Sequence, residues 1–406
     1  MARSYDVFCH VVDNFGDAAV CWRLSRGLAE LPARPSVRLW IDDLNALRTL
    51  VPELRTDAPH QSRAGIEIVH LRADADFGAP AEVAVDAFGG GLPEVYTQAM
   101  VRREAEPGGR SLWIVLEYLS AEPWVATHHG LPSPHPRLPL RRHFFFPGFT
   151  AQSGGLLRET GLDQRRQAFL ADPGRQTALW RDAGFAPPPA GTTLVTLFGY
   201  EQAPIDELLE VWVRGAEPIL AAVPTSRLEP AVAAFMGAAG SAAAPLAGRS
   251  LRRGSLEVRF LPFLPQDRYD ELLWAADWNF VRGEDSFVRA QWAERAFVWQ
   301  LYPQAGGAHL AKLEAFLDLY CVGLDAKPAA ALRNLFRVWN AAQAGPAGPR
   351  RAEIARAWTA LAAHNGQLPG ELRRHARNWA SRAAAAGDLA TNLARFCAER
   401  LECPAF

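Results

Sequence analysis

Cysteine and lysine are scarce in this 406-residue chain, and both shortages narrow the classes of protein that it can belong to. The cysteines show no CxxC spacing and are too few for a disulfide scaffold, so we expect reduced, mostly buried thiols in a cytoplasmic protein. They are Cys9, Cys21, Cys321, Cys397 and Cys403. Only Lys312 and Lys327 are lysines, and the formal net charge of −1 gives no basis for binding nucleic acid.

Sequence patterns of several protein classes are also absent. No run of about 18 apolar residues predicts a membrane span, and the opening MARSYDVFCHVVDNF lacks the apolar core and cleavage site of a signal peptide. No GxxxxGK[ST] stretch occurs, which excludes a P-loop, and FGGGLPE does not fit the GxGxxG pattern of a dinucleotide site. The histidines lack HExxH-type spacing, so we expect no metal ion.

Short apolar runs alternate with helical patterns along the chain, which is typical of βαβ units around a parallel sheet. The runs in the first half are 7–12, 37–41, 66–71, 83–88, 112–116 and 143–146. Those after a proline-rich linker at 185–191 are 193–198, 218–223, 256–261, 278–281 and 297–302. The proline-rich stretch 128–149 and the Gly/Ala-rich stretch 236–248 are predicted to be surface loops, and everything from Pro328 onward is predicted to be helical. We therefore expect two α/β domains, with ligands at the carboxyl ends of their strands.

Two carboxylates, Asp13 and Asp17, follow the first predicted strand at the point where a helix begins. A structural interpretation is available for both: an Asx turn for Asp13 and a favourable place in the helix's first turn for Asp17. A cap needs only one acid, however, and Gly16 lets the backbone turn tightly beside the pair. The pair is therefore a candidate site at the carboxyl end of a strand.

A second candidate lies in FVRGEDSFVRAQWA, where a strand ends at Arg282-Gly283 and Glu284-Asp285-Ser286 opens a helix. Backbone amides at a helix N-terminus suit a phosphate, and Arg282 can add a charge-assisted contact to the same group. Two acids sit awkwardly beside an anion, so at least one of Glu284 and Asp285 should face a sugar hydroxyl or an amide. The alternative is an acidic helix cap with no ligand.

The third candidate is aromatic. LVTLFGYE places Phe198 and Tyr200 at the end of one strand, and EVRFLPFLPQ places Phe263 beyond the end of another. Aromatic side chains at strand ends can stack on a planar base. The same residues could instead pack in the core or between domains.

These motifs resemble those of the EarP family, the protein-arginine rhamnosyltransferases. DNFGD, LFGYE, PFLPQDRYDELLW, RGEDSFVRAQWA and LYPQAGGAHLAKLEAFL carry the resemblance, which runs through the whole chain. It implies the GT-B fold, with two Rossmann-like domains facing across a cleft and C-terminal helices packing back on the N-terminal domain. The expected domains are residues 1–184, joined by about 386–406, and residues 190–385. The implied reaction is an inverting transfer of L-rhamnose from TDP-β-L-rhamnose to one arginine of translation elongation factor P, without a cofactor or metal.

Carried over residue by residue, the resemblance assigns roles to the three candidate regions. Asp13 and Asp17 match the acceptor-side aspartates, and we choose Asp17 as the base and Asp13 as the group that orients the arginine. Glu284 matches a glutamate that is important in the family, so we count it with Asp13 and Asp17 among the predicted catalytic residues. The residues that match donor-binding segments are Phe198, Tyr200, Phe263, Gln266, Arg282, Glu284, Asp285 and Ser286.

Two other functions remain open at this point. Another GT-B transferase or a sugar-nucleotide epimerase would share the donor segment but would have no need of paired acids for a guanidinium. A non-catalytic module that docks on a translation factor would have the same partner but would not depend on a nucleotide sugar. We expect neither a membrane nor a nucleic acid as partner.

Overall fold

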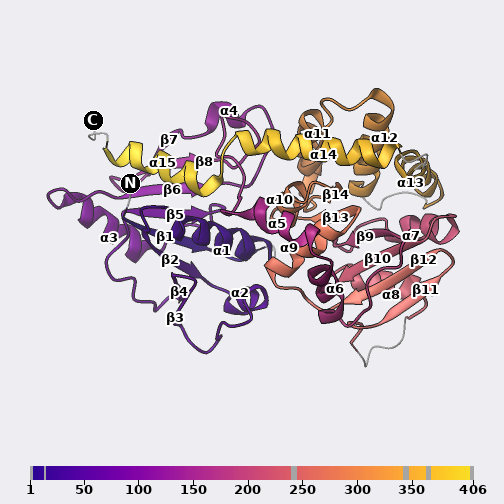
Figure 1. Cartoon of the computed structure of the whole chain (residues 1–406). Helices are drawn as coiled ribbons and strands as arrows, with labels where there is room; N and C mark the ends of the chain where they lie inside the picture. Colours follow the sequence, from indigo (N-terminus) through magenta and orange to yellow (C-terminus); the bar gives the residue numbers. More distant parts are fainter. Residues whose placement is uncertain (1–2, 13–14, 239–244, 342–346, 363–366, 403–406) are drawn as a thin grey trace. The chain divides into compact units, whose positions relative to one another are not determined.

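The computed structural model describes residues 3–12, 15–238, 245–341, 347–362 and 367–402 (Figure 1). The chain divides into two compact units. The first unit comprises Met1–Leu162 with Arg382–Phe406, and the second comprises Asp163–Ser381. Each unit is built on one mostly parallel sheet, so the expected α/β class with two sheets is confirmed.

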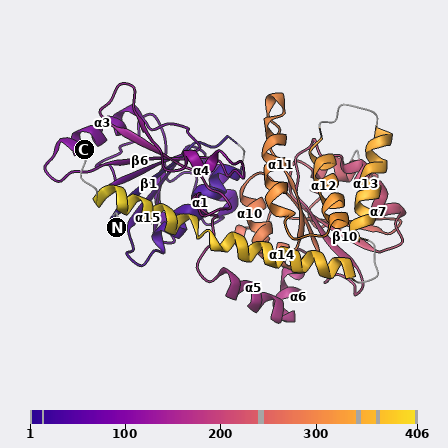
Figure 2. The same ribbon diagram turned by 90° about the horizontal axis from the view of Figure 1, so that it is seen from above.

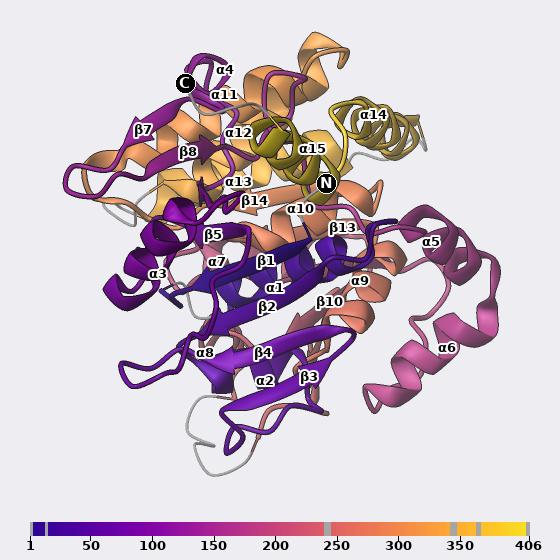
Figure 3. The same cartoon turned by 90° about the vertical axis from the view of Figure 1, so that its left-hand side faces the viewer.

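The first unit contains an eight-stranded sheet (Figure 3). Its strands are β1 (Ser4–Cys9), β2 (Ser36–Ile41), β3 (His60–Arg63), β4 (Ile66–His70), β5 (Val83–Ala87), β6 (Leu112–Leu116), β7 (Pro132–Pro134) and β8 (Arg141–Phe145). Its helices are α1 (Gly16–Ala29), α2 (Leu44–Leu50), α3 (Glu94–Ala105), α4 (Val125–His128) and α15 (Leu389–Glu402). The parallel strands run in the order β4-β2-β1-β5-β6-β8, which is the order of a Rossmann sheet. The order of the strands reverses between β1 and β5, where such sheets bind ligands.

The second unit contains a six-stranded sheet in the order β11-β12-β10-β9-β13-β14. Its strands are β9 (Thr193–Leu197), β10 (Ile219–Pro224), β11 (Ser250–Arg253), β12 (Leu256–Leu261), β13 (Trp278–Arg282) and β14 (Ala296–Gln300). Its helices are α5 (Leu162–Ala171), α6 (Pro173–Asp182), α7 (Ile205–Arg214), α8 (Glu229–Phe235), α9 (Gln266–Ala275), α10 (Asp285–Trp292), the 3-10 turn η1 (Ala305–Gly307), α11 (Ala308–Tyr320), α12 (Ala326–Asn340), α13 (Ala347–Ala362) and α14 (Gln367–Ala385). The five parallel strands again follow the Rossmann order, and the reversal falls between β9 and β13.

The first strand ends earlier than the apolar run predicts. The run reaches Val12, but β1 ends at Cys9. It ends there because carboxylate side chains accept hydrogen bonds from backbone amides that follow the strand. The Val11 N–H donates to Asp42 Oδ1 at 3.0 Å, and the Val12 N–H donates to Asp17 Oδ2 at 2.9 Å. Amides that are bonded to carboxylates cannot extend the ladder to a neighbouring strand.

Three short antiparallel edge strands, β3, β7 and β11, are absent from the prediction. The prediction of a loop for 128–149 is wrong at Pro132–Pro134, which forms β7, whereas β8 (Arg141–Phe145) overlaps the strand that was predicted at 143–146. The prolines of β7 are tolerated because an edge strand needs amides on one side only. Residues 239–244 of the predicted Gly/Ala loop lie outside the described residues.

Helix α15 completes the first unit by packing against α1 and β6 (Figure 2). Its buried side, with Leu389, Leu393 and Cys397, is the apolar stripe seen in the sequence. Close approach to α1 depends on Gly27, since a Cβ there would lie 2.9 Å from the Cβ of Ala390. The chain therefore returns to its first unit through its last helix.

Candidate active site

Asp17 lies at the carboxyl end of β1, in the first turn of α1. Its side chain is almost completely buried, with 2% exposure, and its Oδ2 accepts the Val12 N–H. The residue at the N-cap is Phe15, which makes no side-chain capping bond. Asp13 lies outside the described residues. The structure thus places one of the two predicted acids at the point where the strand order of the first sheet reverses.

A second carboxylate, Asp42, follows the neighbouring strand β2 and was not among the predicted residues. Its Oδ2 lies 3.1 Å from His10 Nδ1, and its Oδ1 accepts the Val11 N–H. Its position directly after a predicted strand is the sequence signal that would have identified it. Asp17 and Asp42 together hold the segment that leaves β1.

In the second unit, the turn after β13 is held from two sides. The Ser286 hydroxyl donates to the carbonyl of Arg282 and accepts the Arg282 N–H at 3.1 Å. Trp299 Nε1 donates to the carbonyl of Gly283 at 2.7 Å, and Gly283 has a φ of 63°, which favours glycine. Glu284 occupies the N-cap of α10 but makes no side-chain capping bond, so the acidic-cap alternative does not describe it. The turn therefore presents the first amides of α10 with Glu284 beside them.

Arg282 lies against two aromatic rings that the sequence separates from it by about eighty residues. Its guanidinium carbon is 4.7 Å from the ring centre of Phe198 and 4.5 Å from that of Tyr200. Tyr200 is fixed through its backbone, because its N–H donates to Gln300 Oε1 at 2.8 Å. Arg282 is 5% exposed and Tyr200 is 1% exposed, whereas Phe198 is half-buried. Of these two rings, Phe198 is the one that keeps exposed surface.

The remaining predicted donor residues lie between β12 and α9. Phe263 is half-buried, and Gln266, the first residue of α9, is buried. One turn further, the Tyr269 ring lies 5.6 Å from that of Phe198. Burial and, secondly, the charge of Asp285 raise the pKa of the Tyr269 hydroxyl well above its ordinary value, so it stays protonated. Tyr269 lies within the motif PFLPQDRYDELLW but was not among the predicted site residues.

Helices α9 and α10 are joined by a buried ion pair that keeps this region rigid. Arg289 donates to both oxygens of Asp270, at 2.9 and 2.6 Å, and neither residue is more than 3% exposed. A two-pronged bond of this kind fixes orientation as well as distance. The amide end of α10, the Arg282 guanidinium and the Phe198 ring are consequently preorganised for an anion attached to a planar base.

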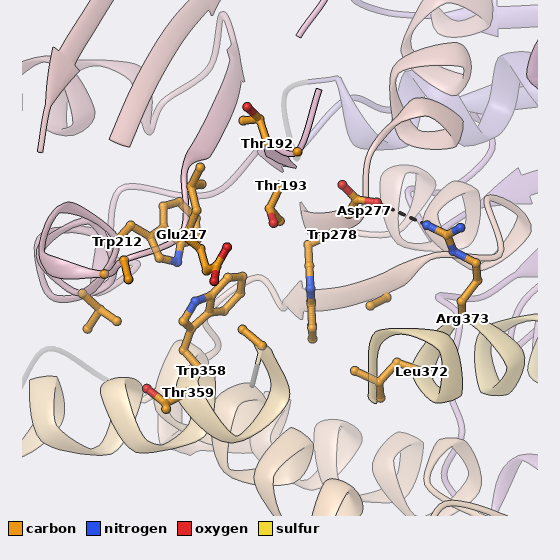
Figure 4. Close-up of a pocket in the computed structure, with 17 residues that line it drawn as sticks. Thr192, Thr193, Trp212, Glu217, Asp277, Trp278, Trp358, Thr359, Leu372 and Arg373 are labelled. Carbon is orange, nitrogen blue, oxygen red and sulfur yellow. Dashed lines mark hydrogen bonds and ion pairs between the residues drawn. The ribbon is translucent and has the colours of Figure 1, made fainter. Parts of the chain in front are cut away.

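A separate cavity of about 580 Å³ lies within the second unit (Figure 4). Thr193, Ile219, Trp278 and Ala296, which line it, are the first residues of β9, β10, β13 and β14. An ion pair of Asp277 and Arg373, 3.2 Å apart, borders it. The cavity is therefore at the amino ends of these strands, at the edge of the sheet opposite to Arg282 and Glu284. Ligands of open α/β sheets bind at the other edge.

Within the described ranges, no three His, Cys, Asp or Glu side chains come together in a group able to hold a metal ion. The chain does contain one Asp-x-Asp sequence, Asp74-Ala75-Asp76, but its acids serve local structure. Asp74 pairs with Arg72 at 3.1 Å, and Asp76 accepts the Gly78 N–H at 2.9 Å. Every helix in these ranges is too short or too polar to cross a bilayer, and the four described cysteines are free and buried.

Comparison with known proteins gives the same family as the motifs. Residues 5–398 match the family described as Elongation-Factor P (EF-P) rhamnosyltransferase EarP. The chain is 42% identical over 397 residues to a protein of Pseudomonas putida named protein-arginine rhamnosyltransferase, which covers 98% of this chain and 99% of that protein. A protein of the same name from Pseudomonas aeruginosa is 43% identical over 398 residues, covering 98% of this chain and 100% of that protein.

A solved structure agrees with the sequence matches. It is described as the structural basis for EarP-mediated arginine glycosylation of translation elongation factor EF-P, and it matches 98% of this chain and 99% of its own with 32% identity and a TM-score of 0.65. The expectations of an enzyme, a glycosyltransferase and the GT-B class of fold are thereby confirmed. The chain belongs to the EarP family of rhamnosyltransferases.

Proposed function

We propose that this enzyme transfers L-rhamnose from TDP-β-L-rhamnose to one arginine side chain of translation elongation factor P, with inversion at the anomeric carbon. Its full-length relation to proteins named protein-arginine rhamnosyltransferase supports an arginine acceptor. The observation that carries the proposal is the buried Asp17 carboxylate at the strand-order reversal of the first sheet. An acceptor that serves translation also implies a cytoplasmic place of action.

An arginine side chain is a poor nucleophile, and this can explain why the site would need two acids. A guanidinium has a pKa above about 12 and delocalised lone pairs, so a carboxylate cannot deprotonate it in advance. We propose that Asp13 holds the guanidinium through N–H···O bonds and points one nitrogen at the anomeric carbon. As the C–N bond forms and the bond to the diphosphate oxygen breaks, that nitrogen loses conjugation and its proton passes to Asp17.

The second unit would bind the donor. The first amides of α10 and the Arg282 guanidinium offer positive charge to the diphosphate, and this charge stabilises the leaving group as it departs. The half-buried rings of Phe198 and Phe263 would stack on the thymine, with Gln266 beside them. Tyr200 would act through Arg282, which it supports. Glu284 would face a sugar hydroxyl, and no metal would be needed because the helix end and arginine supply the charge.

The test is an intact-mass assay of elongation factor P incubated with the enzyme and TDP-rhamnose in the presence of EDTA. We expect a mass increase of one deoxyhexose. Asp17→Asn should abolish the product but leave the Kd for TDP-rhamnose unchanged in calorimetry, because the base is not needed to bind donor. Glu284→Ala and Phe263→Ala should instead weaken donor binding. The exposed Asp57→Asn is the control, since Asp57 pairs with Arg55 on the surface of the first unit.

Two results would contradict the proposal. Loss of donor binding in Asp17→Asn would show that Asp17 takes part in donor binding. The proposal assigns Asp17 to the acceptor and the turn after β13 to the donor, and this separation of roles would then be wrong. A product with another nucleotide sugar, or with a small-molecule acceptor but never with elongation factor P, would favour a different GT-B transferase.

A further inference from the structure

Phe88 has a backbone conformation that bulky side chains rarely adopt. It follows β5 and has a φ of 60°, in the left-handed region. Three glycines, Gly89 to Gly91, come directly after it and could have taken that conformation without strain. A strained residue persists only where its surroundings impose it, and such residues gather at functional sites.

The surroundings of Phe88 do impose this conformation. The Phe88 N–H donates to the carbonyl of Leu116 at 2.6 Å, which ties the turn to β6. Asp86 is buried, and its Oδ1 accepts the Gly91 N–H at 2.9 Å, which closes the turn. The turn also lies directly on His10, because a Cβ at Gly90 would be 2.6 Å from His10 Cδ2.

The strained turn places the Phe88 ring flat against Tyr118. The ring centres are 4.4 Å apart, and the planes differ by 16°. Tyr118 is 39% exposed and Phe88 is half-buried, so part of each ring can be reached from solvent. Phe88 and Tyr118 together form what we call the aromatic platform, at the carboxyl ends of the adjacent strands β5 and β6.

The aromatic platform is next to the acidic end of β1. Strand β5 pairs with β1, with Phe8 opposite Asp86, so the turn after β5 adjoins the segment that leaves β1. That segment is held by the carboxylates of Asp42 and Asp17. A planar aromatic surface beside carboxylates is suited to a planar cation.

We infer that the aromatic platform receives the guanidinium of the acceptor arginine by stacking and so determines the specificity for arginine. The inference rests on the proposed function, since it names the surface that holds the proposed acceptor. Guanidinium is planar and weakly hydrated and stacks well on aromatic rings, whereas the compact lysine ammonium keeps its water more strongly. The platform orients the acceptor side chain and leaves the proton transfer to Asp17.

The test uses Phe88→Gly, which removes the ring and relieves the backbone strain at once. We expect the KM for elongation factor P to rise about ten-fold, equal to about 1.4 kcal/mol, while the Kd for TDP-rhamnose stays the same. The melting temperature should hold or rise, because glycine adopts this φ freely. A purely structural Phe88 would give the opposite pattern, a lower melting temperature with an unchanged KM.

Ala64→Gly is the matched control, since Ala64 has a φ of 51° at an exposed turn of the same unit. It should relieve strain equally and leave the KM unchanged. Tyr118→Leu and Tyr118→Phe form a second pair that involves no strained backbone: leucine should raise the KM, and phenylalanine, which keeps the ring, should not. An unchanged KM in both Phe88→Gly and Tyr118→Leu would overturn the inference. If the wild-type enzyme adds no deoxyhexose, the proposed function itself fails, so the two failures are distinguishable.

Discussion

Arg282 shows how a single side chain of this enzyme is prepared for a ligand. Its guanidinium lies within 5 Å of the Phe198 and Tyr200 ring centres and is nearly buried. Holding a cation in place before the ligand arrives lowers the conformational entropy lost on binding. The positive charge would therefore need little rearrangement to contact the diphosphate of the proposed donor.

We expect Arg282→Lys to raise the Kd for TDP about ten-fold, although the charge is kept, because an ammonium neither stacks as well nor binds two oxygens at once. Isothermal titration calorimetry measures this. Arg253→Lys is the control, since Arg253 also lies over a ring, 4.7 Å from the centre of Phe235, but on the exposed strand β11. Equal affinities of Arg282→Lys and the wild type would mean that Arg282 does not contact the phosphates.

At the scale of elements, the contact between α15 and the β8 region contains two histidines that burial keeps neutral. The His129 ring lies 6.4 Å and the His143 ring 5.7 Å from the ring of Phe396 in α15. Burial lowers the pKa of both histidines below the ordinary 6.5. The folded state consequently binds fewer protons at these sites than the unfolded chain does.

This difference makes the free energy of unfolding depend on pH. The contribution of the two histidines is fully present above pH 6.5 and is lost as pH falls from there through their lowered folded-state pKa values. We expect the melting temperature to fall between pH 7.5 and 5.5, and to fall less in the double variant His129→Gln/His143→Gln. Scanning calorimetry at both pH values measures this. An identical drop in both proteins would show that other groups cause it.

At the scale of the whole molecule, the chain leaves its first unit and returns to it. The first unit needs Arg382–Phe406, whereas the second is the continuous segment Asp163–Ser381. The returning segment supplies buried side chains to the first unit's core, among them Leu389, Leu393 and Cys397. Removing it would expose that apolar surface to water.

A fragment of residues 163–381 should therefore unfold cooperatively on its own, as a unit with a complete core does. A fragment of residues 1–162 alone should show no cooperative unfolding transition. The transition should appear when a peptide of residues 382–406 is added in trans. Thermal unfolding followed by circular dichroism distinguishes the two cases. A cooperative transition of residues 1–162 without the peptide would show that α15 is dispensable for this core.

The sequence by itself determined the two Rossmann-type sheets and the regions where chemistry was to be sought. Apolar runs that alternate with helical patterns leave a parallel sheet as the arrangement that buries them, and such a sheet exposes ligand sites at its carboxyl ends. Asp17 and the Arg282–Ser286 turn were identified in this way. The resemblance to the family then implied a donor, an acceptor and roles for single residues, which remain predictions.

Only the tertiary structure decided which side chains meet. The early end of β1 depends on Asp42 from another strand, the place of Arg282 depends on rings about eighty residues away, and the strain at Phe88 depends on β6 and His10. Local sequence patterns report the burial and period of one element at a time. Contacts between distant segments depend on how whole elements pack, and a pattern within one segment does not contain that information.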